Sequence, residues 1–179
     1  MKLETQRLIL RKPIKEDWKE IHELVDKNLI KNFFMPFPYK EKHSKEMINN
    51  AIKCWGKNSY EFIIQKKDTK DIIGMTGIKK INKINKTANL FSWIGPKYRR
   101  KGYITEAKIK INNFCFDKLK LMKLISEVVT FNKPSNQLQK KMGMTLEGVK
   151  RRENLNPFTK KYEDMNLYGL LKEEWKKSK

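Results

Sequence analysis

The stretch Trp93 to Ala107, W-I-G-P-K-Y-R-R-K-G-Y-I-T-E-A, determines which fold the rest of the chain predicts. An apolar run ends at Ile94, a basic loop containing Gly102 follows, and helical spacing begins at Thr105. The first N–H groups of a helix have no intrahelical acceptor and lie at the positive end of its dipole, so they attract anions. The stretch therefore predicts a strand, a phosphate-binding loop and a helix. Taken alone it is also ordinary turn chemistry, and it is not a P-loop, because no G-K-[ST] follows.

Strand-like and helix-like segments extend outward from this stretch. Alternating or continuous apolar runs predict seven strands, at Gln6–Arg11, Tyr60–Lys66, Asp71–Lys80, Thr87–Ile94, Leu124–Val129, Met144–Arg151 and Tyr162–Leu170. Helical spacing predicts four helices, over 15–29, 44–56, 105–119 and 132–143, the second capped by Ser44. No linker interrupts the chain, so we expect a single domain over residues 1–179. The order predicts an α/β fold, with a mixed central sheet of about seven strands flanked by about four helices.

The composition favours anionic partners. Lysine and arginine number 41 against 20 acidic residues, which gives a formal net charge of +21. Such a charge attracts polyanions and repels polycations, although a compositional preference for lysine would give the same count without any function. Cys54 and Cys115 are isolated, so we expect buried thiols in a cytoplasmic protein, with no metal site. No stretch is apolar enough to span a membrane, and we expect no membrane partner.

Four blocks of the sequence resemble the GNAT superfamily of N-acetyltransferases. Trp93 to Ala107 is similar to the acetyl-CoA signature [RQ]-x-x-G-x-[GA] that follows a splayed fourth strand. N-K-P-S-N-Q-L-Q-K-K-M-G-M-T-L-E-G, from Asn132 to Gly148, is similar to the second signature. T-Q-R-L-I-L-R (Thr5–Arg11) and Y-E-D-M-N-L-Y (Tyr162–Tyr168) resemble the RimJ/RimL branch, which acetylates N-termini of ribosomal proteins. The resemblance covers nearly the whole chain and implies a GNAT fold and an acetyl-CoA-dependent N-acetyltransferase.

The resemblance also implies which residues bind the cofactor. Trp93 and Ile94 would hydrogen-bond the pantetheine arm like an added strand. Asn132 would contact the pantetheine amides, unless it only caps the end of a strand. The CoA pyrophosphate would be held by backbone groups of the loop residues Arg99, Arg100, Lys101, Gly102, Tyr103, Ile104 and Thr105.

The catalytic residues implied by the resemblance are Ser135 and Glu153. Ser135 would lie near the thioester sulfur as general acid for the departing thiolate, or would cap a helix, or would do both. Glu153, after the second-last strand, is the candidate general base; a surface charge and a water relay are the alternatives. A backbone N–H near Ile94 is the expected oxyanion donor. Glu106 is expected only to complement the helix dipole.

The sequence departs from the family pattern at four positions. Ile104 stands where Gly or Ala is usual, so either its side chain turns away from the phosphate or the loop is altered. Arg100 replaces a usual Gly, and Met144 replaces a Phe. Gln139 stands where many relatives carry a Tyr acid, which favours Ser135 as the acid.

The aromatic stretch N-F-F-M-P-F-P-Y, from Asn32 to Tyr39, lies where relatives admit the acceptor. Phe34, Met35 and Phe37 are therefore predicted to bind the substrate. The alternative is a hydrophobic plug between the first two helices.

Three functions fit these observations. The first is acetylation of a protein N-terminus, with the basic surface docking near ribosomal RNA. The second is acetylation of a small amine such as an antibiotic or a polyamine. The third is a non-catalytic RNA- or ribosome-binding module on a GNAT scaffold, because a fold alone does not prove activity. The acceptor, the acyl group and the oligomeric state stay open, although relatives are often homodimers.

Overall fold

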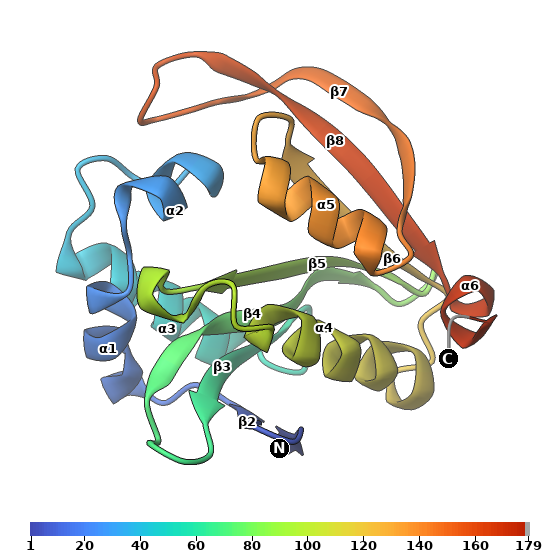
Figure 1. The fold of residues 1–179 in the computed structure, drawn as a ribbon, viewed down its shortest axis with the longest axis horizontal. Helices are drawn as coiled ribbons and strands as arrows, with labels where there is room; N and C mark the ends of the chain where they lie inside the picture. Colours follow the sequence, from blue (N-terminus) through green and yellow to red (C-terminus); the bar gives the residue numbers. More distant parts are fainter. Residues whose placement is uncertain (178–179) are drawn as a thin grey trace.

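One mixed sheet of eight strands runs through the computed structural model, which describes residues 1–177 (Figure 1). The strands are β1 (Lys2–Glu4), β2 (Leu8–Arg11), β3 (Tyr60–Lys66), β4 (Ile72–Asn82), β5 (Thr87–Ile94), β6 (Lys123–Val129), β7 (Thr145–Leu155) and β8 (Tyr162–Leu171). Their order in the sheet is β1-β2-β3-β4-β5-β6-β8-β7. Only the β5–β6 pair is parallel; all the others are antiparallel. The predicted mixed central sheet is confirmed.

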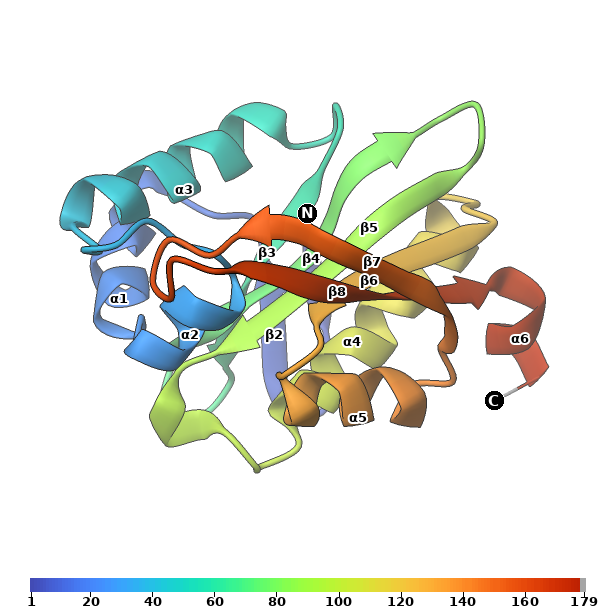
Figure 2. The same cartoon turned by 90° about the horizontal axis from the view of Figure 1, so that it is seen from above.

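Helices cover both faces of the sheet. On one face lies α3 (Glu41–Cys54), with α1 (Trp18–Glu23) packed against it; α4 (Tyr103–Asn113) and α5 (Lys133–Lys141) lie on the other (Figure 2). The shorter helices α2 (Lys27–Asn32) and α6 (Lys172–Lys177) lie at opposite ends of the molecule (Figure 1). Because both faces are covered, the central strands are apolar without alternation: Phe62, Ile63 and Ile64 of β3 are all fully buried.

The element count differs from the prediction. The sheet has eight strands instead of about seven, because the short β1 pairs with β2. The described residues form six α-helices instead of about four. The predicted helix over 15–29 is divided into a 3-10 turn (Lys15–Asp17), α1 and α2. The division occurs because the Asp26 carboxylate accepts the Leu29 N–H at 2.8 Å and starts α2 as a new helix. The remaining helix that was not predicted is α6, which follows β8.

Several predicted boundaries also shift. Ser44 does not cap α3, which begins at Glu41; Ser44 is buried inside the helix, and its hydroxyl donates to the Tyr39 hydroxyl. The helix predicted from Thr105 begins at Tyr103, directly after Gly102. β7 continues to Leu155, so Glu153 lies within the strand and not after it. The last two residues of the predicted domain lie outside the described part of the chain.

The sheet divides where β5 and β6 separate. Their parallel pairing is limited to Thr87–Asn89 with Lys123–Ile125. Beyond these residues β5 continues along β4 as far as Ile94, and β6 continues along β8 as far as Val129. Leu90–Ile94 and Ser126–Val129 are therefore not paired with each other, which is the splay expected at this strand. Each of the two strands has one backbone edge facing the splay.

Gly74 on β4 holds β5 close to β4 at the splay. A Cβ at Gly74 would clash with backbone atoms of Trp93 and Ile94, which cannot move without breaking the ladder. We expect Gly74→Ala to lower the free energy of unfolding by about 2–3 kcal/mol, measured by urea denaturation. The matched control is Gly148→Ala on β7, where an added Cβ meets nothing within 4 Å. Equal stability of the two variants would contradict this explanation of the close β4–β5 contact.

Candidate active site

The basic loop after β5 contains two residues in the left-handed conformation. Arg100 has φ +62° and Gly102 has φ +80°, both left-handed, and α4 begins at the next residue. The left-handed conformation is uncommon for a residue with a side chain, and Arg100 stands at the position where the family pattern has glycine. A left-handed residue next to a right-handed one turns successive N–H groups to one side, so Gly102 followed by the helical Tyr103 favours an anion-binding concavity. The first turn of α4 adds its own N–H groups.

Hydrogen bonds of Arg7 and Glu106 connect this loop to the segment before β2. The Arg7 guanidinium donates to the Glu106 carboxylate (Nε to Oε2, 2.7 Å) and to the Lys101 carbonyl (3.0 Å), and it lies over the Tyr103 ring. Thr5 donates a further hydrogen bond to Glu106 at 2.6 Å. Burial alone raises the pKa of Glu106, but the hydrogen bonds from Thr5 and Arg7 outweigh it and hold the pKa below its ordinary value. Glu106 is thus more than a complement to the helix dipole: it anchors the loop.

The two ends of the loop are also fixed. The Arg99 guanidinium is paired with Asp26 at 3.0 Å, and its Nε contacts the Ile94 carbonyl at 3.4 Å. Its charge is thereby partly balanced, so Arg100 and Lys101, both exposed, carry the uncompensated charge of the loop. Ile104 packs against the hydrophobic core. The side chain that departs from the family pattern therefore turns away from the anion-binding side, which is the first of the two alternatives.

The open edge of β5 has a definite register. The Gly95 N–H donates to the Ile73 carbonyl at 2.9 Å, so Gly95 faces β4. Backbone groups alternate in direction along a strand, so Trp93 also faces β4, while Ser92 and Ile94 face the splay. This register favours Ser92 and Ile94, and not Trp93, as the residues whose backbone meets a strand-like ligand. The Ile94 N–H points to the side where the oxyanion donor is expected.

The start of α5 lies at the end of β6, beside the splay. Asn132 caps α5, and its side-chain oxygen accepts the Ser135 N–H at 3.3 Å. Ser135 is therefore in the first turn and is not itself the cap. One turn later the Gln139 Nε2 lies 3.5 Å from the Ser135 Oγ. On the other side, the Gln139 Oε1 accepts a hydrogen bond from the Lys108 ammonium of α4 at 3.1 Å.

Asn136 joins three elements next to Ser135 and was missed from the sequence. Its Nδ2 donates to the Val129 carbonyl at the end of β6, at 3.1 Å. Its Oδ1 accepts from Asn166 (2.7 Å) and from the fully buried Tyr168 (2.8 Å), both on β8. The signal was its place in the N-x-x-S-N run, directly after Ser135. These bonds fix the start of α5, and with it Ser135, relative to the sheet.

Glu153 lies on β7 in an ion-pair cluster. Its carboxylate accepts from the Lys150 ammonium at 3.2 Å, and the same ammonium donates to Glu127 on β6 at 2.9 Å. Hydrogen bonds to Glu127 and Glu153 raise the pKa of Lys150. Glu127 lies in the splayed part of β6, so it is a second candidate base that the sequence pattern did not single out. The described contacts link Glu153 to the splay through Lys150 and Glu127, and do not join it to Ser135.

The predicted acceptor residues fall into two groups. Met35 is buried in the core, as the plug interpretation requires. Phe37 is exposed and packs edge-on against Phe158 of the β7–β8 hairpin, with ring centroids 4.8 Å apart. Phe34 is partly exposed and has φ +52°, a strained conformation for an aromatic residue.

The aromatic loop is also tied to the hairpin through its backbone. The buried Asn156 of the hairpin donates to the Lys31 carbonyl of α2 at 2.9 Å. The Lys31 ammonium in turn lies 4.4 Å from the centroid of the Phe131 ring, just after β6. The loop, the hairpin and the end of β6 therefore meet at the α2 end of the molecule.

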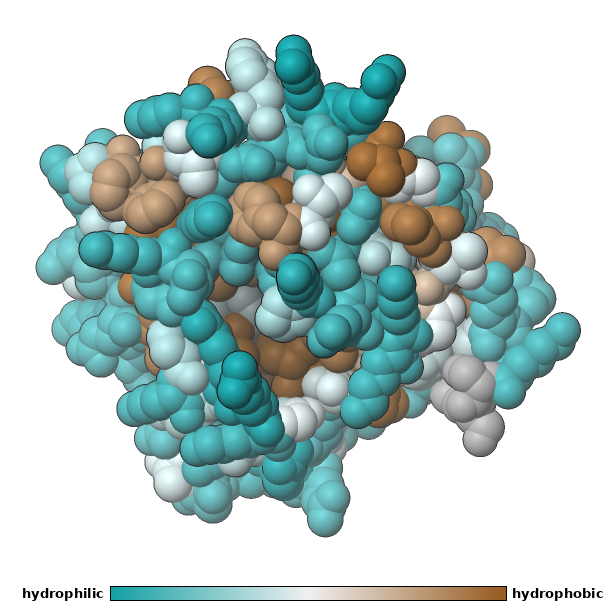
Figure 3. Space-filling view, turned by 45° about the horizontal axis from the view of Figure 1, so that its top comes forward, coloured by the Kyte–Doolittle hydropathy of each residue, from teal (hydrophilic) through white to brown (hydrophobic). Residues whose placement is uncertain are grey.

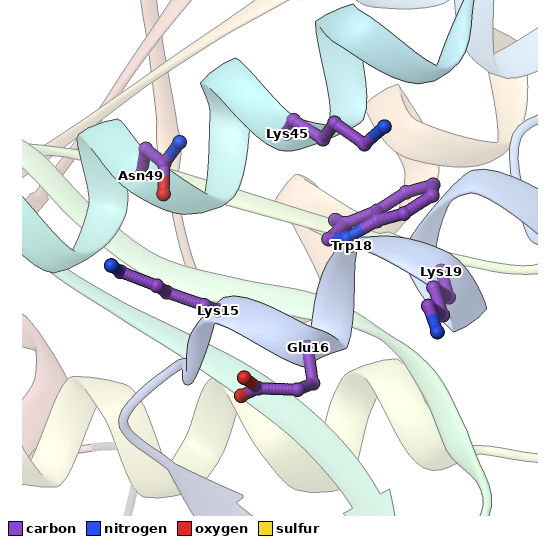
Figure 4. A pocket seen from close by; sticks show the side chains of 6 residues that line it. All are labelled: Lys15, Glu16, Trp18, Lys19, Lys45 and Asn49. Atoms are coloured by element: carbon purple, nitrogen blue, oxygen red, sulfur yellow. The ribbon is translucent and has the colours of Figure 1, made fainter.

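A separate surface cavity of about 400 Å³ lies between α1 and α3, on the face of the sheet away from α4 and α5 (Figure 4). None of the predicted site residues lines it, and its Trp18 ring is already covered by Lys45 at 4.1 Å. Among residues 1–177, no group of three His, Cys, Asp or Glu is arranged to hold a metal ion. No helix in the described part of the chain is long and apolar enough to cross a membrane.

The splay between β5 and β6, with a basic loop at the end of β5, is the arrangement that the GNAT resemblance implies. Residues 7–145 match the family model described as an acetyltransferase (GNAT) domain, and the chain belongs to this family. It is an N-acetyltransferase, and acetyl-CoA is its co-substrate.

Three similar proteins illustrate the range of relatives. The uncharacterized N-acetyltransferase YnaD of Bacillus subtilis is 27% identical over 98% of this chain and 99% of its own length. The ribosomal-protein-serine acetyltransferase of Escherichia coli is 30% identical over 62% of this chain and 59% of its own, which supports the RimJ/RimL resemblance. The crystal structure of spermidine N-acetyltransferase from Vibrio cholerae, in complex with CoA and spermine, superposes with a TM-score of 0.83 at 22% identity, over 96% of this chain and 99% of that one.

The support of the loop by Arg7 can be tested by substitution. Arg7→Ala removes the bond to the Lys101 carbonyl and the ion pair with Glu106, which keeps its bonds to Thr5 and to the backbone N–H of residue 7. We expect roughly tenfold weaker acetyl-CoA binding by calorimetry, equivalent to about 1.4 kcal/mol. The control Arg151→Ala removes an equal charge from the exposed surface of β7. If both variants lose affinity equally, the effect of Arg7 is one of net charge and not of loop shape.

The burial of Lys108 predicts how the free energy of unfolding depends on pH. Burial lowers the pKa of Lys108 to about 8 in the folded protein, from an ordinary value of 10.5. Between these values the unfolded chain binds more protons than the folded one, so stability rises with pH. Relative to Lys108→Met, we expect the free energy of unfolding of the unmodified protein to rise by about 2 kcal/mol from about pH 7 to pH 10. A pH-independent difference between the two proteins would contradict a buried ammonium.

Proposed function

We propose that this N-acetyltransferase acetylates a protein N-terminus of the kind found in ribosomal proteins. The observation that carries the proposal is charge: the net charge is +21, and Lys31, Lys160 and Lys161 add positive charge at the α2 end, where the acceptor is expected to enter. A polyamine with several ammonium groups is repelled by such a surface, whereas a single terminal amine is repelled far less. Figure 3 shows hydrophilic side chains over most of one face, with hydrophobic ones in a hollow near its middle and in smaller patches at its upper right and left.

Acetyl-CoA fits the residues present. The left-handed loop of Arg100 and Gly102 and the first turn of α4 offer N–H groups and positive charge to the pyrophosphate. The free edge of β5 at Ser92 offers strand-like hydrogen bonds to the pantetheine amides, and the Ile94 N–H next to it is kept for the thioester oxygen. Asn132, at the start of α5, lies across the splay from them. When bound, the co-substrate supplies an activated acetyl thioester.

The reaction is direct attack of the amine on the thioester. The amine nitrogen bonds to the acetyl carbon, the carbon–sulfur bond breaks, and the sulfur keeps the electron pair. The Ile94 N–H stabilises the tetrahedral oxyanion, and the Ser135 hydroxyl gives its proton to the thiolate. The proton that the amine loses passes to Glu153, with Glu127 or water as the alternative base, and Ser135 is reprotonated from solvent.

The basic surface supports docking beside ribosomal RNA. Such docking releases counterions from the phosphate backbone, so the affinity falls steeply as salt rises. It would place a ribosomal-protein N-terminus at the aromatic loop, where Phe34 and Phe37 are the candidate contacts. Met35 is buried, so it packs beneath the loop surface in the core and does not contact the acceptor in this proposal.

The function is tested first by calorimetric titration of acetyl-CoA, with ATP as a polyanion control. Micromolar binding of acetyl-CoA with far weaker ATP binding supports a specific cofactor site. Thiol release is then measured with hexapeptides beginning with Ser, Ala or Met and with spermidine. Faster turnover of spermidine than of every peptide would overturn the protein N-terminus as acceptor. Equal binding of ATP and acetyl-CoA would favour a non-catalytic scaffold.

The role of Ser135 gives a kinetic prediction. We expect Ser135→Ala to lower kcat about 100-fold, with little change in acetyl-CoA affinity, because the hydroxyl acts mainly as the thiolate leaves. The control is Ser178→Ala, a serine of the same chain outside the described residues. An unchanged kcat for Ser135→Ala would remove Ser135 from the mechanism. Glu153→Gln and Glu127→Gln, compared in the same assay, assign the base.

A further inference from the structure

Lys108 is an unusual residue for the middle of an amphipathic helix. Its side chain is 2% exposed, between α4 and α5, which lie side by side on one face of the sheet (Figures 1 and 2). Within residues 1–177 it forms no ion pair; the hydrogen bond that it makes is to the Gln139 Oε1, at 3.1 Å. Burying an ammonium with a neutral partner is costly. One turn further, the amide of Asn112 is also buried and has no hydrogen-bond partner among the described residues. A polar strip thus lies where an apolar interface would be more stable.

The chemistry of Lys108 fixes the orientation of the Gln139 amide. An ammonium has only donors, so it must meet the amide oxygen and not the nitrogen. The amide nitrogen then faces the Ser135 Oγ, at 3.5 Å. An amide N–H₂ also has only donors, so Ser135 is the acceptor in this contact. The hydroxyl hydrogen of Ser135 is therefore directed to some other partner.

We propose that Lys108 is a positioning residue that acts through Gln139 to aim the Ser135 hydroxyl at the departing sulfur of CoA. The proposal rests on the function given above to Ser135. Neither Lys108 nor Gln139 gives up a proton in this arrangement. They form a chain of hydrogen bonds that are all donated in one direction, from the Lys108 ammonium to the Gln139 amide and from that amide to the Ser135 hydroxyl. The hydroxyl hydrogen is thereby left to point to where negative charge develops.

Two features of the site support this chain. Since burial lowers the pKa of Lys108 only to about 8, the side chain is an ammonium at neutral pH and keeps its donor-only character. Gln139 is itself 3% exposed, so its amide is held between Lys108 and Ser135 and away from solvent. The 3.5 Å contact is long for a hydrogen bond, and catalytic contacts of this kind shorten when substrate binds.

The test compares Lys108→Met and Gln139→Glu with the unmodified protein. Gln139→Glu keeps an oxygen that accepts from Lys108, so a purely structural role of Gln139 predicts no loss of rate. The same substitution removes the N–H₂ that contacts Ser135, so our proposal predicts a clear loss of rate. We expect both variants to lower kcat about tenfold, within the range for residues that orient a catalytic group, with KM for acetyl-CoA changed less than about twofold. Lys110→Met, a partly exposed lysine of the same helix, is the control for lost charge. Turnover is followed as thiol release with the fastest acceptor of the panel, or as hydrolysis of acetyl-CoA by water if none reacts.

A double-mutant cycle with Ser135→Ala separates this inference from the proposed function. If Lys108 acts through Ser135, Lys108→Met has no further effect on kcat in the Ser135→Ala background. Full additivity, or an unchanged kcat for Gln139→Glu, overturns the inference even when Ser135→Ala alone is slow. An unchanged kcat for Ser135→Ala instead overturns the role of Ser135 itself. Circular dichroism and thermal unfolding of each variant confirm that the rates compare folded proteins.

Discussion

The structure depends on how short the parallel pairing between β5 and β6 is. Three residues of each strand pair, and the strands then part while β5 remains on β4 and β6 remains on β8. A backbone edge left unpaired inside a protein is costly unless another group satisfies it. The splay is therefore maintained by the elements around it: the close β4–β5 contact at Gly74, and Asn136 with its bonds to β6 and β8. The arrangement leaves hydrogen-bonding capacity that an extended amide chain, such as pantetheine, can use.

Around the splay, polar contacts replace apolar packing at three places. Arg7 and Glu106 support the loop, Asn136 supports the start of α5, and Lys108 with Gln139 joins α4 to α5. Each of these contacts has a direction, which apolar packing lacks. Direction is what a site needs in order to hold N–H groups and one hydroxyl toward fixed points. The remaining core, around Ile63, Ile73 and Met75, is conventionally apolar and needs only to fill space.

Much of the fold could be predicted from the sequence because its signals are local. The apolar runs predicted every strand of the sheet except β1, and the loop after Ile94 predicted the start of α4 within two residues. The break at Asp26 was missed because an aspartate within a helical pattern is also an ordinary surface charge. The pairing of β1 was missed because three residues carry no periodicity. In the candidate site, the loop residues were singled out by their motif, and their contact with CoA stays a prediction. The supports Arg7, Asn136 and Lys108 were not, because their roles depend on partners distant in sequence or on burial that no motif records.

The contact between the aromatic loop and the β7–β8 hairpin has a consequence for how such an enzyme diverges. Phe37 meets Phe158, and Asn156 meets the Lys31 carbonyl, so two segments more than a hundred positions apart form one rim. Neither segment contributes to the loop that we propose for the pyrophosphate. Loops on a rigid scaffold accept change more readily than the elements that carry them. The residues of the rim can therefore change during evolution, in pairs that contact each other, while the residues proposed to bind the thioester stay the same. This separation allows related enzymes to keep one co-substrate while they differ in the acceptor.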